Sequence, residues 1–437
     1  MPQGTIALKD QFMRELGTLR GNGYPGWYSA IREQHAKQFD AAEFPTQRTE
    51  DWRFTNIKPI LSTAFETVTP ADAAAAKSAV APYLFGDATW TELVFVDGVY
   101  AADLSRIAHK GIVAGSLAAA LHAQDVALES HLGRLFDKKP SVFNALNTAL
   151  ASDGAYVSVP KNAVVDGAIH LVYVTTDRPS PVATHPRTLV IAGQSSQVTL
   201  LETYASLSTT TASFCNAAVE IFLEPNAQVT RYKLLAESEL SYNLTSTRVR
   251  LDRDAKFESY VFNQSGKIVR DDLAVALDGE GAGVELSGLY MTSGDQLVDN
   301  ATSIEHVKPH CSSYIGYKGV LDDSSHGVFS GKIFVHREAQ KTDSNQLNQN
   351  LLLSDKATIN TKPLLEIFAD DVKCTHGATI GQHPEELIFY FRTRAMSEAM
   401  ARGMLTYGFA DEVVNKVALE PLRHRLETFV FDRYSPK

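Results

Sequence analysis

The sequence predicts a mainly β protein in which a β-helix core is flanked by helical N-terminal and C-terminal domains. Two observations carry this prediction. The hydrophobic pattern changes from a helical period to short strand-like runs near Tyr156, and it returns to a helical period after Pro384. Between these points, turn-forming residues recur at steps of about 30 residues, which is typical of stacked coils. We therefore expect domains over residues 1–154, 155–383 and 384–437.

The composition indicates a folded chain with an acidic surface. Of its 437 residues, 44% are hydrophobic and 21% are charged, which is ordinary for a globular protein. The net charge of −10 argues against nucleic acid or an anionic membrane as the main partner. No apolar run reaches the ~20 residues that span a bilayer. The first residues, Met1 to Thr5, lack the basic and apolar regions of a secretory signal, so we expect a cytoplasmic protein.

The N-terminal part is expected to be mostly helical, because Leu8, Phe12 and Leu16 recur at helical steps. One interruption stands out in this part. Residues 92–100 form two short β-rich runs around Asp97-Gly98, a pair that favours a tight turn. We predict a small hairpin there.

The central part, from Tyr156 to about Ile380, indicates a solenoid. Each turn is followed by an apolar run, as in stacked coils that bury one continuous core. A β-sandwich would also give many short strands, but its hairpin signals are scarce here, so a β-helix is favoured over a sandwich. The predicted turns centre on Asn162, Ser195, Asn226, Asp254 and Glu280.

The C-terminal part returns to helices. Pro384, followed by two glutamates, suits a first helical turn, and Ser397 suits the start of a second helix. Gly408 is expected to end that helix. A stripe of apolar residues from Asp411 to about Asp432 predicts the last helix.

Several nucleotide-binding motifs are absent. Gly266-Lys267 and Gly331-Lys332 lack the upstream glycine of a P-loop, so we expect this chain to bind no nucleotide in that way. The spaced glycines Gly279, Gly281 and Gly283 lie between expected strands and predict a turn rather than a dinucleotide site.

Cys374 and His376 are the candidate metal ligands. They lie two residues apart in an expected strand, so both side chains project from one face. A thiolate and an imidazole suit iron, zinc or copper, but they fill only half of a tetrahedral site. Either His310-Cys311 folds alongside and supplies the other ligands, or another polypeptide supplies them, or binding is transient. The alternative is a buried thiol and a hydrogen-bonded histidine that never contact metal.

Asp370-Asp371 offers a second hypothesis, because β-helical carbohydrate-active enzymes use paired carboxylates as acid and base. Adjacent residues of a strand point to opposite faces, so this pair needs a bulge or loop to act together. A cytosolic chain is also a poor place for an enzyme that degrades polysaccharides.

The same C-terminal region resembles the SufB/SufD family of iron–sulfur cluster scaffold proteins, and specifically its SufD branch. Thr375 stands where the family usually has serine, and Ala395 stands where it usually has glycine. Neither change removes a presumed functional group. The matching segments are Arg48–Thr55, Ala339–Asp343, Gln346–Leu353, Lys362–Ile367, Ala369–Gly381 and Phe389–Phe391 with Arg394.

The resemblance implies a right-handed parallel β-helix and a non-enzymatic role within a complex. Such chains pair with a SufB-like scaffold through their β-helix cores and bind a SufC-like ATPase through the C-terminal helices. Nucleotide chemistry then belongs to another chain. A homodimer of the isolated chain remains open, because an edge built for SufB can also pair with itself. We assign four residues to partner binding: Phe389, Tyr390, Arg394 and Phe409.

For the site, the resemblance matches Cys374 and His376 to the family's Cys-x-His positions. It implicates the histidine in holding iron or a nascent iron–sulfur cluster, transiently and shared with the partner. The sulfur-accepting cysteine of the family lies in SufB, so Cys215 and Cys311 are expected to be structural, and three widely spaced cysteines should be reduced thiols. The family's complex also binds a reduced flavin, which nothing in this sequence locates.

Overall fold

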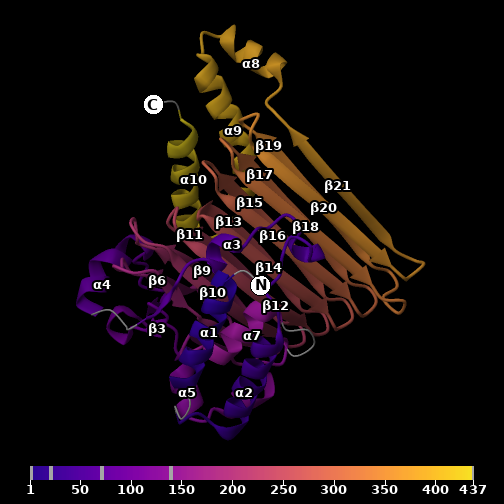
Figure 1. Cartoon of the computed structure of the whole chain (residues 1–437). Coiled ribbons are helices and arrows are strands. Elements are labelled where there is room, and N and C mark those ends of the chain that lie inside the picture. The colour runs from indigo at the N-terminus through magenta and orange to yellow at the C-terminus, as the bar shows by residue number, and fades with distance from the viewer. Residues whose placement is uncertain (1–2, 19–22, 69–72, 137–140, 436–437) are drawn as a thin grey trace.

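Two large, mostly parallel sheets dominate the structure and wind together as one β-helix (Figure 1). This computed structural model describes residues 3–18, 23–68, 73–136 and 141–435. The first two residues, on which the expectation about the N-terminus partly rests, lie outside the described residues. No described helix is long and apolar enough to cross a lipid bilayer.

The strands of the core alternate between the two sheets, so most strands pair in parallel with the strand two places away in sequence. We call the sheet that ends in β20 sheet A and the sheet that ends in β21 sheet B. The chain completes about eight turns, which confirms the predicted parallel β-helix with helical ends. The core strands are β5 (Ala155–Val159), β6 (Ile169–Thr175), β7 (Val182–Thr184), β8 (Arg187–Ala192), β9 (Gln197–Ser206), β10 (Ser213–Leu223), β11 (Gln228–Ala236), β12 (Tyr242–Leu251), β13 (Lys256–Ser265), β14 (Ile268–Leu277), β15 (Gly283–Thr292), β16 (Leu297–His306), β17 (Ser312–Leu321), β18 (His326–Val335), β19 (Asp343–Leu352), β20 (Thr358–Ile367) and β21 (Lys373–Gly381).

The predicted turns lie where the chain crosses between the sheets. At each of them one residue has left-handed backbone geometry, which Asn and Asp tolerate better than most side chains. The fifth turn uses Gly281 for this position rather than the neighbouring Glu280. The left-handed residues at the first four turns are Asn162, Ser195, Asn226 and Asp254.

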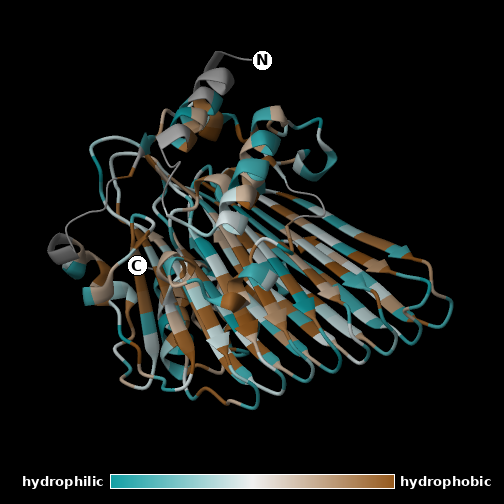
Figure 2. Cartoon of the chain, turned by 90° about the horizontal axis from the view of Figure 1, so that it is seen from below, coloured by the Kyte–Doolittle hydropathy of each residue, from teal (hydrophilic) through white to brown (hydrophobic). Residues whose placement is uncertain are grey.

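Inward-facing side chains form a continuous apolar core between the sheets. Val229, Phe257 and Val284 occupy paired positions on three neighbouring strands of sheet B, and all three are buried. Hydrophobic and hydrophilic segments alternate along the strands in Figure 2, as expected when successive side chains point to opposite faces. This alternation fixes the register, because a slip of one residue would turn the apolar set outward.

Most of the N-terminal helices cover the outer face of sheet A, whereas helix α4 (Ala73–Val80) packs on β6 of sheet B. Helix α7 packs on α2 and on β10, and Asn147 donates hydrogen bonds to the carbonyls of Pro186 and Asn216. The elements of this part are α1 (Gln3–Thr18), α2 (Gly26–Ala41), α3 (Lys58–Leu61), α4 (Ala73–Val80), α5 (Leu117–His122), α6 (Val126–His131) and α7 (Val142–Leu150), the short 3₁₀ turns Glu50–Trp52, Ala81–Tyr83 and Ala102–Leu104, and the strands β1 (Glu66–Thr67), β2 (Thr91–Val96), β3 (Val99–Tyr100) and β4 (Val113–Ser116).

The predicted hairpin is present. Strands β2 and β3 are antiparallel, and both Asp97 and Gly98 have positive φ angles, as a tight hairpin turn requires. Strand β2 also pairs in parallel with β6. The N-terminal part therefore contributes the first strand of sheet B, which the sequence pattern did not predict.

Three helices end the chain: α8 (Glu385–Arg392), α9 (Glu398–Val414) and α10 (Glu420–Tyr434). The predicted starts are confirmed, since Pro384 precedes α8 and the Ser397 hydroxyl caps α9 by accepting a hydrogen bond from the Met400 amide.

The predicted stop at Gly408 is wrong, because α9 continues through it. The apolar face around Val413 packs on sheet B, and this burial outweighs the ~1 kcal/mol that an internal glycine costs. The last helix accordingly begins at Glu420 rather than Asp411.

Candidate functional site

The last turn of the β-helix has two open edges. Strands β20 and β21 each pair with one inner neighbour, and in the described part of the chain neither has a neighbour on its outer side (Figure 1). Their residues are mostly half-buried or exposed, whereas the inner strands are largely buried. Unpaired N–H and C=O groups along such an edge are a template for another strand.

Cys374 and His376 lie on β21, on the face that points into the solenoid. Their register partners on β19 are Ser344 and Gln346, which are both buried. Cys374 is half-buried against the core, while His376 is exposed at the open end. The structure thus confirms that the two side chains share one strand and one face.

The electrostatic environment keeps the Cys374 thiol protonated in the chain by itself. Burial, reinforced by the nearby Asp343 carboxylate, raises the pKa of Cys374 above its ordinary value. A bound cation reverses this effect, because metal ligation requires the thiolate. Among the described residues, neither ring nitrogen of His376 has a hydrogen-bond or ion-pair partner. The imidazole is therefore available as a ligand.

Cys374 and His376 offer two candidate ligands, which is half of a tetrahedral metal site. No group of three or more His, Cys, Asp or Glu side chains among the described residues could hold a metal ion. Cys311 is buried before β17, where its thiol donates to the carbonyl of Gly279 at 3.3 Å. It lies two strands away from β21, or about 10 Å at the usual strand spacing. Neither His310 nor Cys311 therefore completes a site with Cys374 and His376 within the described part of this chain.

The cysteines are all free thiols. Cys215 and Cys311 are buried, and desolvation raises the pKa of both. A buried, protonated thiol behaves as a small apolar side chain.

Asp370 and Asp371 lie in the exposed turn before β21 and not on a strand. Asp371 is ion-paired with Lys341 of the neighbouring turn, and its backbone is tied to the same turn through Gln340. This arrangement fixes a turn–turn contact. It does not form a cleft with two facing carboxylates.

An exposed apolar patch lies on the C-terminal helices. Phe389 is 69% exposed and Tyr390 is 50% exposed on α8, and the guanidinium of Arg394 lies 3.6 Å from the Tyr390 ring centre. We call this the α8 patch, and the further exposed apolar residues of α8 and α9 are Leu387, Met400 and Met404.

Phe409 lies apart from the α8 patch. It packs on the outer face of sheet B, where the ammonium of Lys318 lies 4.4 Å from its ring centre and donates to its carbonyl oxygen at 3.2 Å. The structure therefore brings Arg394 onto Tyr390 and exposes Phe389 on the same helix, but it places Phe409 in the contact between α9 and the β-helix.

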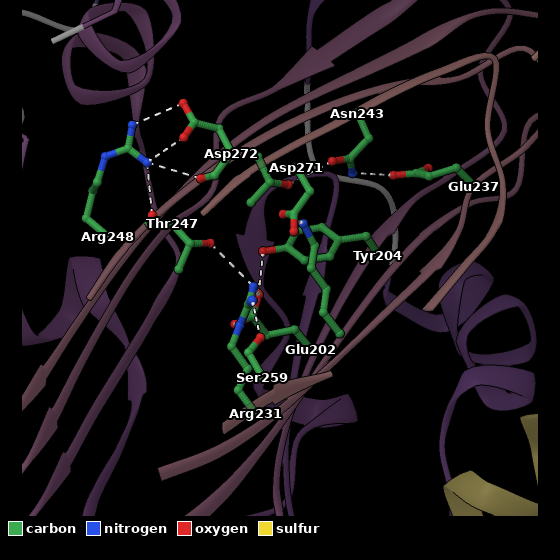
Figure 3. Close-up of polar contacts among 12 residues, drawn as sticks. Glu202, Tyr204, Arg231, Glu237, Asn243, Thr247, Arg248, Ser259, Asp271 and Asp272 are labelled. Carbon is green, nitrogen blue, oxygen red and sulfur yellow. Dashed lines mark hydrogen bonds and ion pairs between the residues drawn. The ribbon is translucent and has the colours of Figure 1, made fainter. Parts of the chain in front are cut away.

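The structure also contains a charged network inside the β-helix that the sequence pattern did not predict (Figure 3). Arg231 pairs with Glu202 at 2.7 Å, and Lys233 pairs with Asp271 at 2.7 Å, all four being buried. A signal was present in the sequence. Counting by two from the inward-facing Val229 places Arg231 and Lys233 inside the solenoid.

The sequence pattern also did not predict a cleft on the outer face of sheet A. It has a volume of about 640 Å³ and is formed between residues 47–55 and strands β16, β18 and β20. Glu50 pairs with Lys362 across it at 2.6 Å, and the Thr55 hydroxyl donates to Asp299. The segment 48–55 thus ties the N-terminal part to the last turns of the β-helix.

Comparisons with known proteins agree with these features. The family model for the SufBD core domain of SUF system FeS cluster assembly matches residues 173–409, and the model for the SufBD protein N-terminal region matches residues 22–171. An iron–sulfur cluster assembly SufBD family protein of Synechocystis is 33% identical, over 91% of this chain and 89% of the relative. Iron–sulfur cluster assembly protein SufD of Escherichia coli is 29% identical, over 90% of each chain. A chloroplastic protein of Arabidopsis thaliana, ABCI7, is 28% identical, over 92% of this chain and 85% of the relative.

Proposed function

This chain belongs to the SufBD family of iron–sulfur cluster assembly proteins as a SufD homologue, and we propose that it is a non-enzymatic scaffold subunit of that system. In this proposal it pairs with a SufB-like chain through the open end of its β-helix. Iron or a nascent cluster is then held at that interface as cargo, with His376 and Cys374 as this chain's ligands.

The observation that carries the proposal is the position of the Cys374/His376 half-site on β21, one of the two open edge strands at the end of the β-helix. A second β-helix that extends these sheets would bring its own side chains over the same inward face. Thiolate and imidazole are suitable ligands for iron, and iron–sulfur clusters accept both. A partner that supplies the remaining ligands would thus complete a site that neither chain forms alone.

The α8 patch supports a second contact, with a SufC-like ATPase. Aromatic and arginine side chains are enriched at protein interfaces, and α8 exposes Phe389 and Tyr390, with Arg394 against the Tyr390 ring. The proposed ATPase supplies the nucleotide chemistry, for which this sequence has no P-loop. We place the assembly in the cytoplasm.

An anaerobic pull-down with the full-length tagged chain tests this proposal. Bound proteins are identified by mass spectrometry, and iron and sulfide are counted for the native chain, for His376→Ala and for His424→Ala, which removes an exposed imidazole far from the half-site. We expect a SufB-like scaffold and an ATPase with all three chains, and loss of iron and sulfide only with His376→Ala. Recovery of the chain alone or as a homodimer would contradict the pairing with a SufB-like scaffold. Equal iron content with the native chain and both variants would mean that this chain is a structural partner that does not contact the metal.

A further inference from the structure

A row of buried amides lies directly beneath the last turn of the β-helix. Gln346, Asn348 and Asn350 all point inward from β19 and are almost fully buried. Asn348 donates to the Tyr317 carbonyl at 3.2 Å, and Asn350 donates to the Asn348 side chain at 2.7 Å. These two amides are therefore satisfied by their neighbours, as buried polar groups normally are.

Gln346 differs from the other two. Its side-chain nitrogen donates to the Gly331 carbonyl at 3.3 Å, but its Oε1 atom has no hydrogen-bond partner among the described residues, although the residue is only 1% exposed. The orientation of the amide is fixed, because only its nitrogen can donate to a carbonyl. Burial removes the hydrogen bonds that this acceptor makes to water, and no protein donor replaces them, so the desolvation cost is not offset.

Gly331 makes room for this amide. A Cβ atom at position 331 would lie 1.9 Å from the Gln346 nitrogen, so the amide occupies the space that a side chain would fill. The amide is thus held across the interior, between the two sheets, one turn below the open end.

The nearest position above Gln346 is His376. The two residues are register partners on adjacent strands, which lie about 4.8 Å apart, and both point to the interior. The imidazole has no partner among the described residues, and the amide oxygen beneath it has none either. A ring N–H is the donor that the amide oxygen lacks.

We propose that Gln346 is the positioning residue for His376, an inference that rests on the proposed function of His376 as an iron ligand. When a partner covers the open end, the imidazole donates one ring N–H to Oε1 of Gln346. This hydrogen bond fixes the neutral tautomer and directs the lone pair of the other nitrogen outward, toward iron. Histidine ligands commonly depend on such a partner for the second ring nitrogen.

Three variants of the full chain, each purified anaerobically with its partners, test the inference. Gln346→Met keeps the length of the side chain and removes the acceptor. Gln346→Glu, protonated when buried, keeps one donor and one acceptor. Asn348→Leu is the matched control, because it removes a buried amide from the same strand at a position paired with Ala378 rather than with His376.

The first measurement is solid-state NMR of the metal-free complex with ¹⁵N-histidine in this chain, the His376 signals being assigned as those lost in His376→Ala. We expect a single hydrogen-bonded neutral tautomer in the native chain, in Gln346→Glu and in Asn348→Leu, and a mixture of tautomers in Gln346→Met. The second measurement is titration with Fe²⁺ alone, for which we expect a loss of affinity of about 10- to 100-fold only in Gln346→Met.

The outcomes separate this inference from the proposed function. If His376→Ala loses iron but Gln346→Met matches the native chain in tautomer and in Fe²⁺ affinity, the positioning role is wrong and the ligand role stands. If His376→Ala retains native Fe²⁺ affinity, the ligand role itself is wrong. If Asn348→Leu lowers the Fe²⁺ affinity as much as Gln346→Met does, the effect comes from general disruption of the core. That result would also overturn the inference.

Discussion

Arg231 and Glu202 form an ion pair inside the β-helix, where the guanidinium Nε lies 2.7 Å from the carboxylate and neither side chain reaches solvent. Tyr204 adds a hydrogen bond to the same carboxylate at 3.1 Å. Charges in such a place are costly to desolvate, so the pair is tolerated only because each charge neutralises the other.

Removing one member of this pair should therefore destabilise the fold strongly. We expect Arg231→Met to lower the free energy of unfolding by about 3–5 kcal/mol, because Glu202 is left charged and buried. The double variant Glu202→Leu/Arg231→Met should recover most of this loss. Urea unfolding followed by circular dichroism measures the free energy of unfolding of the single and the double variant. If the value for Arg231→Met lies within about 1 kcal/mol of that for the native chain, Glu202 does not depend on Arg231 for its burial.

Stability should also depend on pH through Glu237. Burial raises the pKa of this carboxyl from 4.5 to about 7, partly offset by a hydrogen bond from Asn243 and by the charge of Lys233. The folded state therefore binds a proton that the unfolded state has released, and this carboxyl makes stability fall as the pH rises from about 4.5 to about 7.

Glu237→Gln removes this ionisation while keeping an acceptor for Asn243. We expect it to stabilise the chain by up to about 3 kcal/mol at pH 8, at ~1.4 kcal/mol per pKa unit, and to have little effect at pH 4.5. Melting temperatures of the native chain and of the variant across this range test the sign. Glu239→Gln, at an exposed position two residues away, is the control and should show no such trend.

The sequence predicts some features of the fold and of the candidate site and not others. The turns at Asn162, Asn226 and Asp254 were predictable, because few side chains tolerate left-handed geometry and these types do. The strand bearing Cys374 and His376 was also predictable, since a period of two places both on one face. The helix end at Gly408 was not, because packing on sheet B outweighed the local preference of glycine.

The pairing of Arg231 with Glu202 needed the structure. The alternation along β11 places Arg231 inside, but its partner lies one full turn earlier, and that pairing depends on the register between β9 and β11. The same holds for Gln346 beneath His376. Sequence spacing shows which residues face inward, and only the winding of the solenoid shows which of them meet.

The α8 patch should matter for binding and not for folding. Phe389→Ser should change the free energy of unfolding by less than about 0.5 kcal/mol, because the ring is exposed, and should lower recovery of the ATPase about tenfold or more. Phe431→Ser removes a comparably exposed ring from α10 and is the matched control. If Phe389→Ser and Phe431→Ser recover equal amounts of the ATPase, the α8 patch is not part of the proposed interface.

In the proposed complex, His376 contacts the iron of the nascent cluster at the interface with the partner scaffold. The most direct test is pulsed electron paramagnetic resonance of the reduced cluster in a complex in which only this chain carries ¹⁵N-histidine. We predict a ¹⁵N coupling to the cluster with the native chain and with His424→Ala, and its loss with His376→Ala. A cluster that forms on the native complex without any ¹⁵N coupling would contradict a ligand role for His376.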